Sequence, residues 1–74
     1  SRMEYLLMEL LMMNQGTYLS AEVILSKVWG YDSDAEPGNV WVYISYLRKK
    51  LTELGCGVGI KVKRGIGYTL EVLS

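Results

Sequence analysis

The sequence predicts an α+β fold of the mainly α class, with three helices followed by a C-terminal β-hairpin. Apolar residues recur at helical spacing in three segments, and Gly16, Gly30 and Gly55 follow these segments where a helix would end. Two β-prone runs then flank Gly65-Ile66-Gly67, which is typical of a hairpin. This order of elements predicts a winged helix-turn-helix, in which the second helix supports the third and the hairpin forms the wing.

The first two helices have recognisable starts. Ser1 and Glu4 have the spacing of a capping box, so a first helix is expected from there to about Asn14. Its nearly continuous apolar residues predict burial on several sides. Ser20 is a favourable N-cap for a second helix over residues 21–29. The side chains of this second helix that are expected to face inward are Val23, Ile24, Val28 and Trp29.

The third helix is the most informative segment. A polar loop over residues 31–38 precedes it, and the helix is expected over residues 39–54. Steps of four, three and four positions place one apolar stripe against the core, namely Val40, Ile44, Leu47 and Leu51. The opposite face of this helix combines aromatic, hydroxyl and cationic groups suited to base edges and phosphates. The candidate DNA-binding residues on the other face are Asn39, Trp41, Val42, Tyr43, Ser45, Tyr46, Arg48 and Lys49.

The chemistry of these side chains suggests their roles in a major groove. Val42 can contact a thymine methyl group, and either Ser45 or Tyr46 can form a hydrogen bond with a base edge. Arg48 and Lys49 are expected to meet phosphates. The predicted interface therefore reads bases with neutral groups and holds the backbone with cations.

The wing is predicted from strands over residues 60–64 and 68–73. Two glycines allow a tight turn between these strands. Arg64 is expected to project toward the minor groove or its phosphates, because narrow A-tract grooves attract arginine. Tyr68 is expected to pack against the domain with its hydroxyl free for a phosphate. The candidate DNA-binding residues of the wing are Lys63, Arg64, Gly65, Gly67 and Tyr68.

The distribution of charge supports a polyanionic partner although the formal net charge is zero. Residues 1–40 hold two basic and six acidic residues, whereas residues 41–70 hold six basic residues and one acidic residue. Such segregation focuses a positive field on the half of the chain that contains the third helix and the wing.

Composition excludes several other classes of function. A chain of 74 residues makes one domain, here residues 1–74, and it has no apolar run long enough for a membrane span and no signal-peptide pattern. With one Cys and no His, neither a Cys–His catalytic pair nor a His/Cys zinc site can form, and a reducing cytoplasm is expected. The acidic residues at 32, 34 and 36 resemble the start of a calcium loop, but Pro37 stands where the turn glycine belongs. No enzymatic activity, metal or cofactor is therefore expected.

Four motifs together resemble one known family, the C-terminal effector domains of OmpR/PhoB-type response regulators. The motifs are Ser1-x-x-Glu4 with the Leu/Met run, Leu19-Ser20 with Leu25 and Val28-Trp29-Gly30, the segment from Asn39 to Leu51, and Arg64-Gly65-Ile66-Gly67-Tyr68. Their order and spacing cover nearly the whole chain. The resemblance implies a cytoplasmic transcription regulator of a two-component phosphorelay that binds direct-repeat promoter DNA as a tandem dimer.

The resemblance also implies further partners. A receiver domain, phosphorylated by an upstream histidine kinase, would control DNA binding, and neither that domain nor the family's N-terminal β-sheet is in this chain. In the family, the loop before the third helix contacts RNA polymerase. The corresponding candidate residues are Tyr31, Asp32, Asp34 and Glu36.

Three departures from the family pattern make the base preference impossible to transfer. Trp41 replaces a residue that is very often acidic, and it either contacts the groove edge or covers the neighbouring turn. Ser45 and Tyr46 stand where some members have arginine, and Val62-Lys63 replaces a common Thr-Val pair.

Two hypotheses of different class follow. The main one is sequence-selective binding of double-stranded DNA by the effector domain of a transcriptional regulator. The alternative is a winged helix used for protein–protein interaction, with Trp41, Tyr43 and Tyr46 as an aromatic contact surface. The lysines of the same region argue against the alternative, because the centres of protein interfaces are depleted of lysine.

Overall fold

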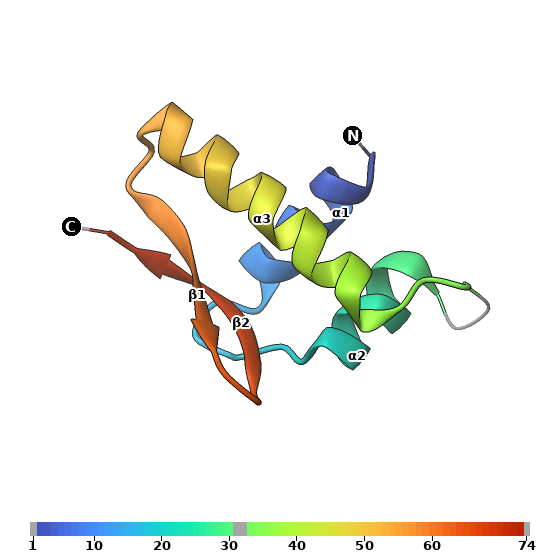
Figure 1. Ribbon diagram of the computed structural model, residues 1–74. Coiled ribbons are helices and arrows are strands. Elements are labelled where there is room, and N and C mark those ends of the chain that lie inside the picture. Colours follow the sequence, from blue (N-terminus) through green and yellow to red (C-terminus); the bar gives the residue numbers. More distant parts are fainter. Residues whose placement is uncertain (1, 31–32, 74) are drawn as a thin grey trace.

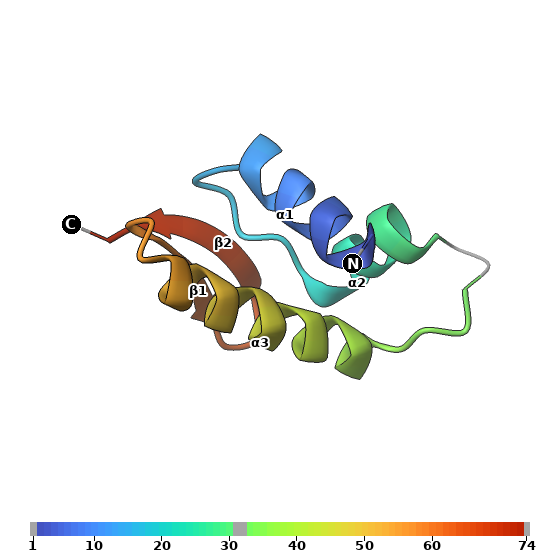
Figure 2. The same ribbon diagram turned by 90° about the horizontal axis from the view of Figure 1, so that it is seen from above.

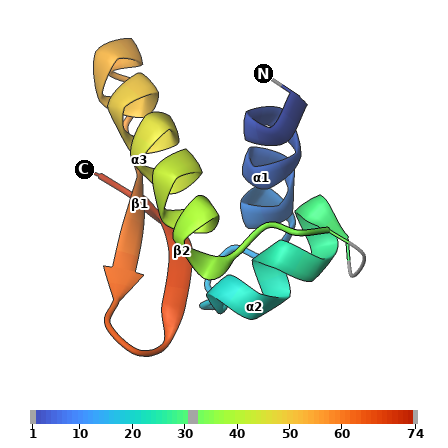
Figure 3. The ribbon, with the colours of Figure 1, turned by 45° about the vertical axis from the view of Figure 1, so that its right-hand side comes forward.

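The described part of the chain, residues 2–30 and 33–73 of a computed structural model, confirms the predicted order of helices and hairpin (Figure 1). The elements are α1 (Arg2–Met13), α2 (Ala21–Ile24), which continues directly as the π-helical turn η1 (Leu25–Trp29), α3 (Pro37–Leu54), β1 (Val58–Lys63) and β2 (Gly67–Val72). Helix α3 crosses the whole molecule, α1 lies alongside it, and the hairpin extends beyond its N-terminal half (Figures 1 and 3).

Helix α1 is buried on more than one side, as predicted. Leu7 and Leu11 are fully buried, and Met3, Leu6, Met8 and Leu10 are partly buried against the core. The helix packs against α3, η1 and β2, and its remaining side exposes Tyr5, Met12 and Met13. The helix ends one residue earlier than predicted, at Met13. The capping box predicted at Ser1 lies outside the described residues.

The second helix covers the predicted residues, but its last turn is widened to π-type. Ser20 is the N-cap, and its Oγ accepts a hydrogen bond of 3.2 Å from the backbone N–H of Val23. Ile24 and Val28 are buried as predicted and Trp29 packs at the edge of the core, but Val23 is exposed. The buried side of the helix spans Ala21, Ile24, Leu25, Val28 and Trp29, and Val23 falls outside this stripe.

Helix α3 begins at Pro37, two residues before its predicted start. Proline is favourable in the first helical turn because the N–H that it lacks would have no intrahelical partner there. Glu36 is the N-cap of a capping box, in which its N–H donates to Asn39 Oδ1 over 2.7 Å. Gly55 ends the helix with a φ of 61°, a left-handed conformation that costs glycine little.

The hairpin is antiparallel, with Val58 opposite Val72 and Lys63 opposite Gly67. Strand β1 begins two residues before the prediction and ends one earlier, and β2 is shifted by one residue, so Arg64 belongs to the turn. The connector before α2 joins the hairpin at the base of its turn, because Leu19 and Tyr68 exchange two backbone hydrogen bonds of 2.8 and 2.9 Å. A Cβ atom at Gly67 would overlap the Leu19 carbonyl, so only glycine permits this approach.

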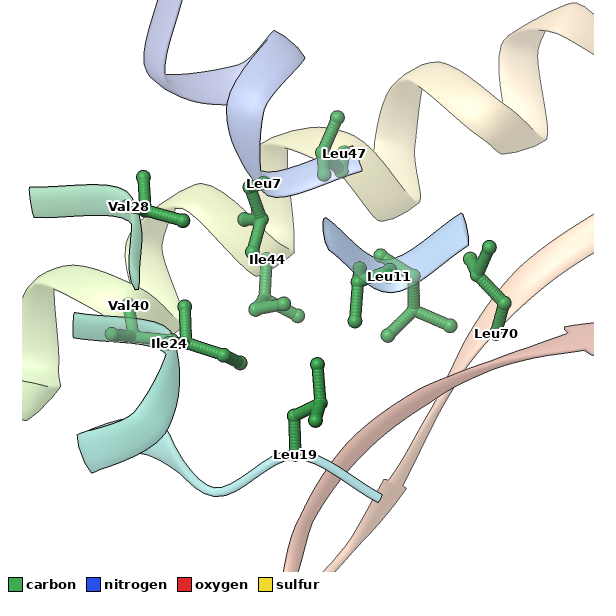
Figure 4. Close-up of a cluster of buried hydrophobic side chains, with 10 residues drawn as sticks. Leu7, Leu11, Leu19, Ile24, Val28, Val40, Ile44, Leu47 and Leu70 are labelled. Atoms are coloured by element: carbon green, nitrogen blue, oxygen red, sulfur yellow. The ribbon is translucent and has the colours of Figure 1, made fainter. Parts of the chain in front are cut away.

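The core lies where all these elements meet. Figure 4 shows side chains from α1, α2, η1, α3, the connector and β2 pointing toward one another. Seen from above, α1 and β2 lie on the same side of α3 (Figure 2), so one face of α3 is covered and the opposite face is left open. The buried residues are Leu7, Leu11, Leu19, Ile24, Val28, Val40, Ile44, Leu47, Ile60 and Leu70.

Candidate nucleic-acid interface

The back face of α3, formed by Val40, Ile44 and Leu47, is buried, and Leu51 is partly buried against the core, which confirms the predicted core stripe. Its opposite front face comprises Val42, Ser45, Tyr46 and Lys49. Of these side chains Val42 and Tyr46 are large, apolar or aromatic, and exposed to 41% and 51%. Because a large part of each of these two side chains remains in contact with water, the front face is available to a partner.

Three aromatic rings connect the front face with the supporting helix. Tyr43 is half-buried, with its ring centroid 5.3 Å from that of Trp29 at an angle of 67° and 5.7 Å from that of Tyr46 at 78°. Both are edge-to-face contacts, the arrangement that the aromatic quadrupole favours. Tyr43 therefore braces Tyr46 from behind and presents only part of its own ring at the surface.

Two polar side chains at the start of the interface have one hydrogen-bonding function already used. Ser45 Oγ donates to the Trp41 carbonyl over 2.9 Å, so its free capacity is that of an acceptor. Asn39 accepts the capping hydrogen bond from Glu36 with Oδ1, and its Nδ2 amide remains a donor. Ser45 thus suits a base that presents an amino group, and Asn39 suits an acceptor such as a phosphate oxygen.

The cations of α3 divide between partner and fold. Arg48 and Lys49 are exposed, whereas Lys50 Nζ lies 2.8 Å from Glu4 Oε1 of α1. The Lys50 ammonium lowers the pKa of the Glu4 carboxyl from its ordinary value of 4.5. The adjacent residues Lys49 and Lys50 therefore have different surroundings, and Lys50 forms an ion pair that links α3 to α1.

The wing turn is exposed and carries two cations. The backbone N–H of Ile66 donates to the Lys63 carbonyl over 3.0 Å, and Gly65 has a φ of 78° that glycine adopts without steric cost. Arg64 projects from this turn with an exposed side chain. Lys63 Nζ lies 5.6 Å from the centroid of the Tyr18 ring, a cation–π contact. The sequence does not reveal this pairing of Lys63 with Tyr18, since nothing in the local pattern links positions so far apart.

A hollow of about 370 Å³ separates the wing from the first turns of α2 and α3. It is lined by Ser20, Ala21 and Glu22 on one side and by the hairpin turn on the other. Trp41 and Tyr68 form its aromatic wall, with ring centroids 6.4 Å apart and ring planes at 29°. The ring of Trp41 thus lies on the wing, and Tyr68 is half-buried and packs on the core, as predicted.

The remaining predicted site residues belong to the segment before α3. Asp34 and Glu36 are exposed in the segment before α3, and Tyr31 and Asp32 are not among the described residues. Within residues 2–30 and 33–73, no group of three or more His, Cys, Asp or Glu side chains is close enough to hold a metal ion. Over the same residues, none of the helices is long and apolar enough to cross a membrane.

A three-helix domain with an exposed cation-bearing helix and a basic wing is a winged helix of the DNA-binding class. Residues 1–70 match the family described as transcriptional regulatory protein, C terminal, and the chain belongs to this family. The chain is 46% identical, over 71 residues, to response regulator ArlR of Staphylococcus haemolyticus. That match covers 96% of this chain and 32% of ArlR, so the chain spans about a third of the length of this curated relative.

Solved structures of the same kind superimpose on nearly the whole chain. The DNA-binding domain of Bacillus subtilis CssR is 30% identical with a TM-score of 0.82, and the match covers 96% of this chain and 76% of that one. The DNA-binding domain of response regulator AdeR, solved in complex with an intercistronic region, is 27% identical with a TM-score of 0.84. That match covers 96% of this chain and 70% of the AdeR chain. The likeness extends through all helices and the wing.

Proposed function

We propose that this chain binds double-stranded promoter DNA sequence-selectively, as the effector domain of a two-component response regulator that controls transcription. The observation that carries the proposal is the pairing of an open front face on α3 with a basic, exposed wing, which Trp41 of α3 contacts through Tyr68. Membership of the family of C-terminal transcriptional regulatory domains supports it. So does the intercistronic region bound by the similar AdeR domain.

The front face of α3 reads the major groove. Val42 contacts thymine methyl groups, and Ser45 accepts a hydrogen bond from a base amino group because its proton is already donated to the backbone. Tyr46 adds a second contact to base edges, while Arg48 and Lys49 hold the phosphates on either side. Discrimination by these neutral groups is modest for each base, and several positions must add to it.

The wing holds the adjoining minor groove. Arg64 enters the groove or meets its phosphates, and Lys63 contacts the backbone beside it. Gly65 and Gly67 supply the backbone shape that brings these cations forward, and Tyr68 supports the turn from its base.

Regulation and assembly follow from the larger protein in which such domains occur. The curated relatives are response regulators about three times as long as this chain. We assign the chain to a cytoplasmic protein in which a receiver domain, phosphorylated by an upstream histidine kinase, promotes tandem binding to repeated half-sites. Two weak binding events then gain affinity through their linkage. The exposed Asp34 and Glu36, with Tyr31 and Asp32, are the proposed contact for RNA polymerase. No chemical reaction is assigned to the chain.

Salt-dependent binding to a pool of random duplexes tests the proposal. Fluorescence anisotropy is measured at several salt concentrations, and the bound fraction is sequenced. With about four to six phosphates contacted, the plot of log K against log salt has a slope of roughly −4 to −5. The bound fraction is enriched in a short direct repeat. A flat salt response at measurable affinity would contradict the proposal, and a folded protein that binds no duplex at low salt would favour a protein partner for the aromatic residues.

A further inference from the structure

The hairpin contacts α3 in two different ways along the helix. Toward the C-terminal half of α3, the contact is part of the core, where Leu47, Ile60 and Leu70 are all buried. At the N-terminal end, the hairpin contact is the stack of Trp41 on Tyr68, and Trp41 is 47% exposed. This aromatic pair therefore lies at the edge of the core, with Tyr68 on its inner side and Trp41 on its outer side, at the end of α3 that carries Val42 and Ser45.

Tyr68 is a fixed support for this stack. Its backbone N–H donates to the Leu19 carbonyl and its carbonyl accepts from the Leu19 N–H, which ties it to the connector before α2. The turn beyond it is open, since a Cβ atom built on Gly65 would meet nothing within 4 Å. The stack thus lies between an anchored base, at Tyr68, and an exposed turn over residues 64–66.

We propose that Trp41 is a positioning residue for the wing, whose indole, stacked on Tyr68, fixes the exposed turn of residues 64–66 relative to the front face of α3. The consequence of this inference for sequence recognition rests on the proposed DNA binding. If α3 reads a major groove while Arg64 enters the next minor groove, the stack sets the spacing and angle between the two contacts. Because arginine prefers the narrow groove of A-tracts, a fixed wing gives a preference for an A-tract beside the major-groove site.

Tyr46 provides a matched control for Trp41. It is an aromatic residue on the same helix with a similar exposure, 51% against 47%, but its ring contact is with Tyr43 rather than with the hairpin. Replacing either residue removes an exposed ring from α3. Only the replacement of Trp41 removes the contact with the wing, and Trp41→Phe restores a ring at that place.

The first measurement needs no DNA. Backbone amide ¹⁵N relaxation reports order parameters for residues 64–66 in the wild type, Trp41→Ala, Trp41→Phe and Tyr46→Ala. The order parameters of the turn are expected to fall in Trp41→Ala and to stay at the wild-type level in the other two variants. Unchanged order parameters in Trp41→Ala would overturn the positioning role, whether or not the protein binds DNA.

The second measurement uses two duplexes that share the selected major-groove site and differ only in the flank beneath the wing, which is an A-tract or G·C-rich. The wild type is expected to prefer the A-tract, and Trp41→Ala to reduce this preference by about two- to tenfold, the range measured for an aromatic pair. Tyr46→Ala should weaken binding to both duplexes alike. The affinity lost through Arg64→Ala should be smaller when Trp41 is already Ala, because the two changes then affect one contact.

The outcomes separate this inference from the proposed function. Equal weakening of both duplexes by Trp41→Ala, with an undiminished effect of Arg64→Ala, would make Trp41 a direct DNA contact and overturn the positioning role. A wild type without a preference between the flanks would overturn the link to groove geometry. A wild type that binds neither duplex would contradict the proposed function, and the order parameters would still decide whether Trp41 fixes the wing.

Discussion

The two faces of α3 carry different kinds of residue, and a different requirement explains each face. The back face, Val40, Ile44 and Leu47, is buried and meets side chains from every other part of the domain. The front face has exposed Val42, Tyr46 and Lys49, which the fold does not require in these positions. Burial of apolar surface therefore explains the back face, whereas only a partner explains why aromatic, hydroxyl and cationic groups gather on the front.

The same division separates neighbouring lysines. Lys50 contacts Glu4 of α1 and belongs with the back face, although its side chain is more than half exposed. Lys49 is one residue earlier and faces outward with the front face. The wing divides in the same way, because its base is tied to Leu19 and its turn is open. In each comparison, a substitution on one side tests the stability of the fold, and a matched substitution on the other side tests the contact with a partner.

The largest effect is expected from Ile44→Ala on the back face. Truncating this fully buried side chain leaves a cavity and should lower the free energy of unfolding by about 2–5 kcal/mol, a large part of the stability of a small domain. Val42→Ala on the front face should change it by less than about 0.5 kcal/mol and weaken DNA binding instead. Urea unfolding followed by circular dichroism measures both, and similar losses of stability would abolish the distinction between the faces.

The next effect concerns the base of the wing. Gly67→Ala should destabilise the domain by about 1–3 kcal/mol, because the new methyl group overlaps the Leu19 carbonyl and lies 2.9 Å from the Ser20 backbone nitrogen. Gly38→Ala is the matched control, since its Cβ meets nothing within 4 Å and alanine favours the helix there. Thermal unfolding should show a lower midpoint for the first variant and an unchanged or higher one for the second. A wild-type midpoint for Gly67→Ala would mean that the hairpin is free to move away from Leu19.

The periodic parts of the molecule were predictable from the sequence. Val40, Ile44 and Leu47 are buried as their spacing predicts, and the exposed turn of the wing follows the glycines around Ile66. The predicted start of α3 at residue 39 is two residues late, because Pro37 falls in the polar sequence that predicts a loop. Proline in a first helical turn is nevertheless a usable local signal.

Contacts between distant positions could not be predicted in the same way. Glu4 and Lys50 are 46 residues apart, and Glu4 was assigned to a capping box with its own helix. Lys63 meets Tyr18 because the hairpin packs against the connector, and Trp41 meets Tyr68 because the hairpin packs against α3. Tertiary packing decides such pairs, and no local period encodes it. The DNA contacts assigned to the front face and the wing remain predictions.

The two adjacent lysines test the division of cations. Lys49→Gln should make the slope of log K against log salt shallower by about 0.9, because one phosphate contact is lost. Lys50→Gln should leave the slope unchanged and lower the stability of the fold, because Glu4 loses the ammonium group 2.8 Å from its Oε1. The comparison uses one duplex and one salt series for both variants. Equal changes in slope would show that Lys50 leaves Glu4 to contact DNA.

The smallest effect is expected from the Glu4–Lys50 ion pair between α1 and α3, whose contribution to the free energy of unfolding depends on pH. Pairing lowers the pKa of Glu4 in the folded state below 4.5, so the folded protein binds fewer protons than the unfolded chain as the pH falls through this range. The stability that the pair contributes is therefore fully present above about pH 5 and is lost as the pH falls toward the folded-state pKa.

Glu4→Gln should remove this part of the acid dependence. Because Lys50 is largely exposed and water screens the pair, the difference in the free energy of unfolding at pH 7 should be about 1 kcal/mol or less. Urea unfolding of both proteins from pH 7 to pH 3 should give curves that converge as the pH falls. Glu9→Gln removes the same charge from an exposed position on α1, and its free energy of unfolding should depend on pH as that of the wild type does. Parallel curves for the wild type and Glu4→Gln would show that the carboxylate contributes no ion-pair stability, and the back face of α3 would then be held by apolar packing alone.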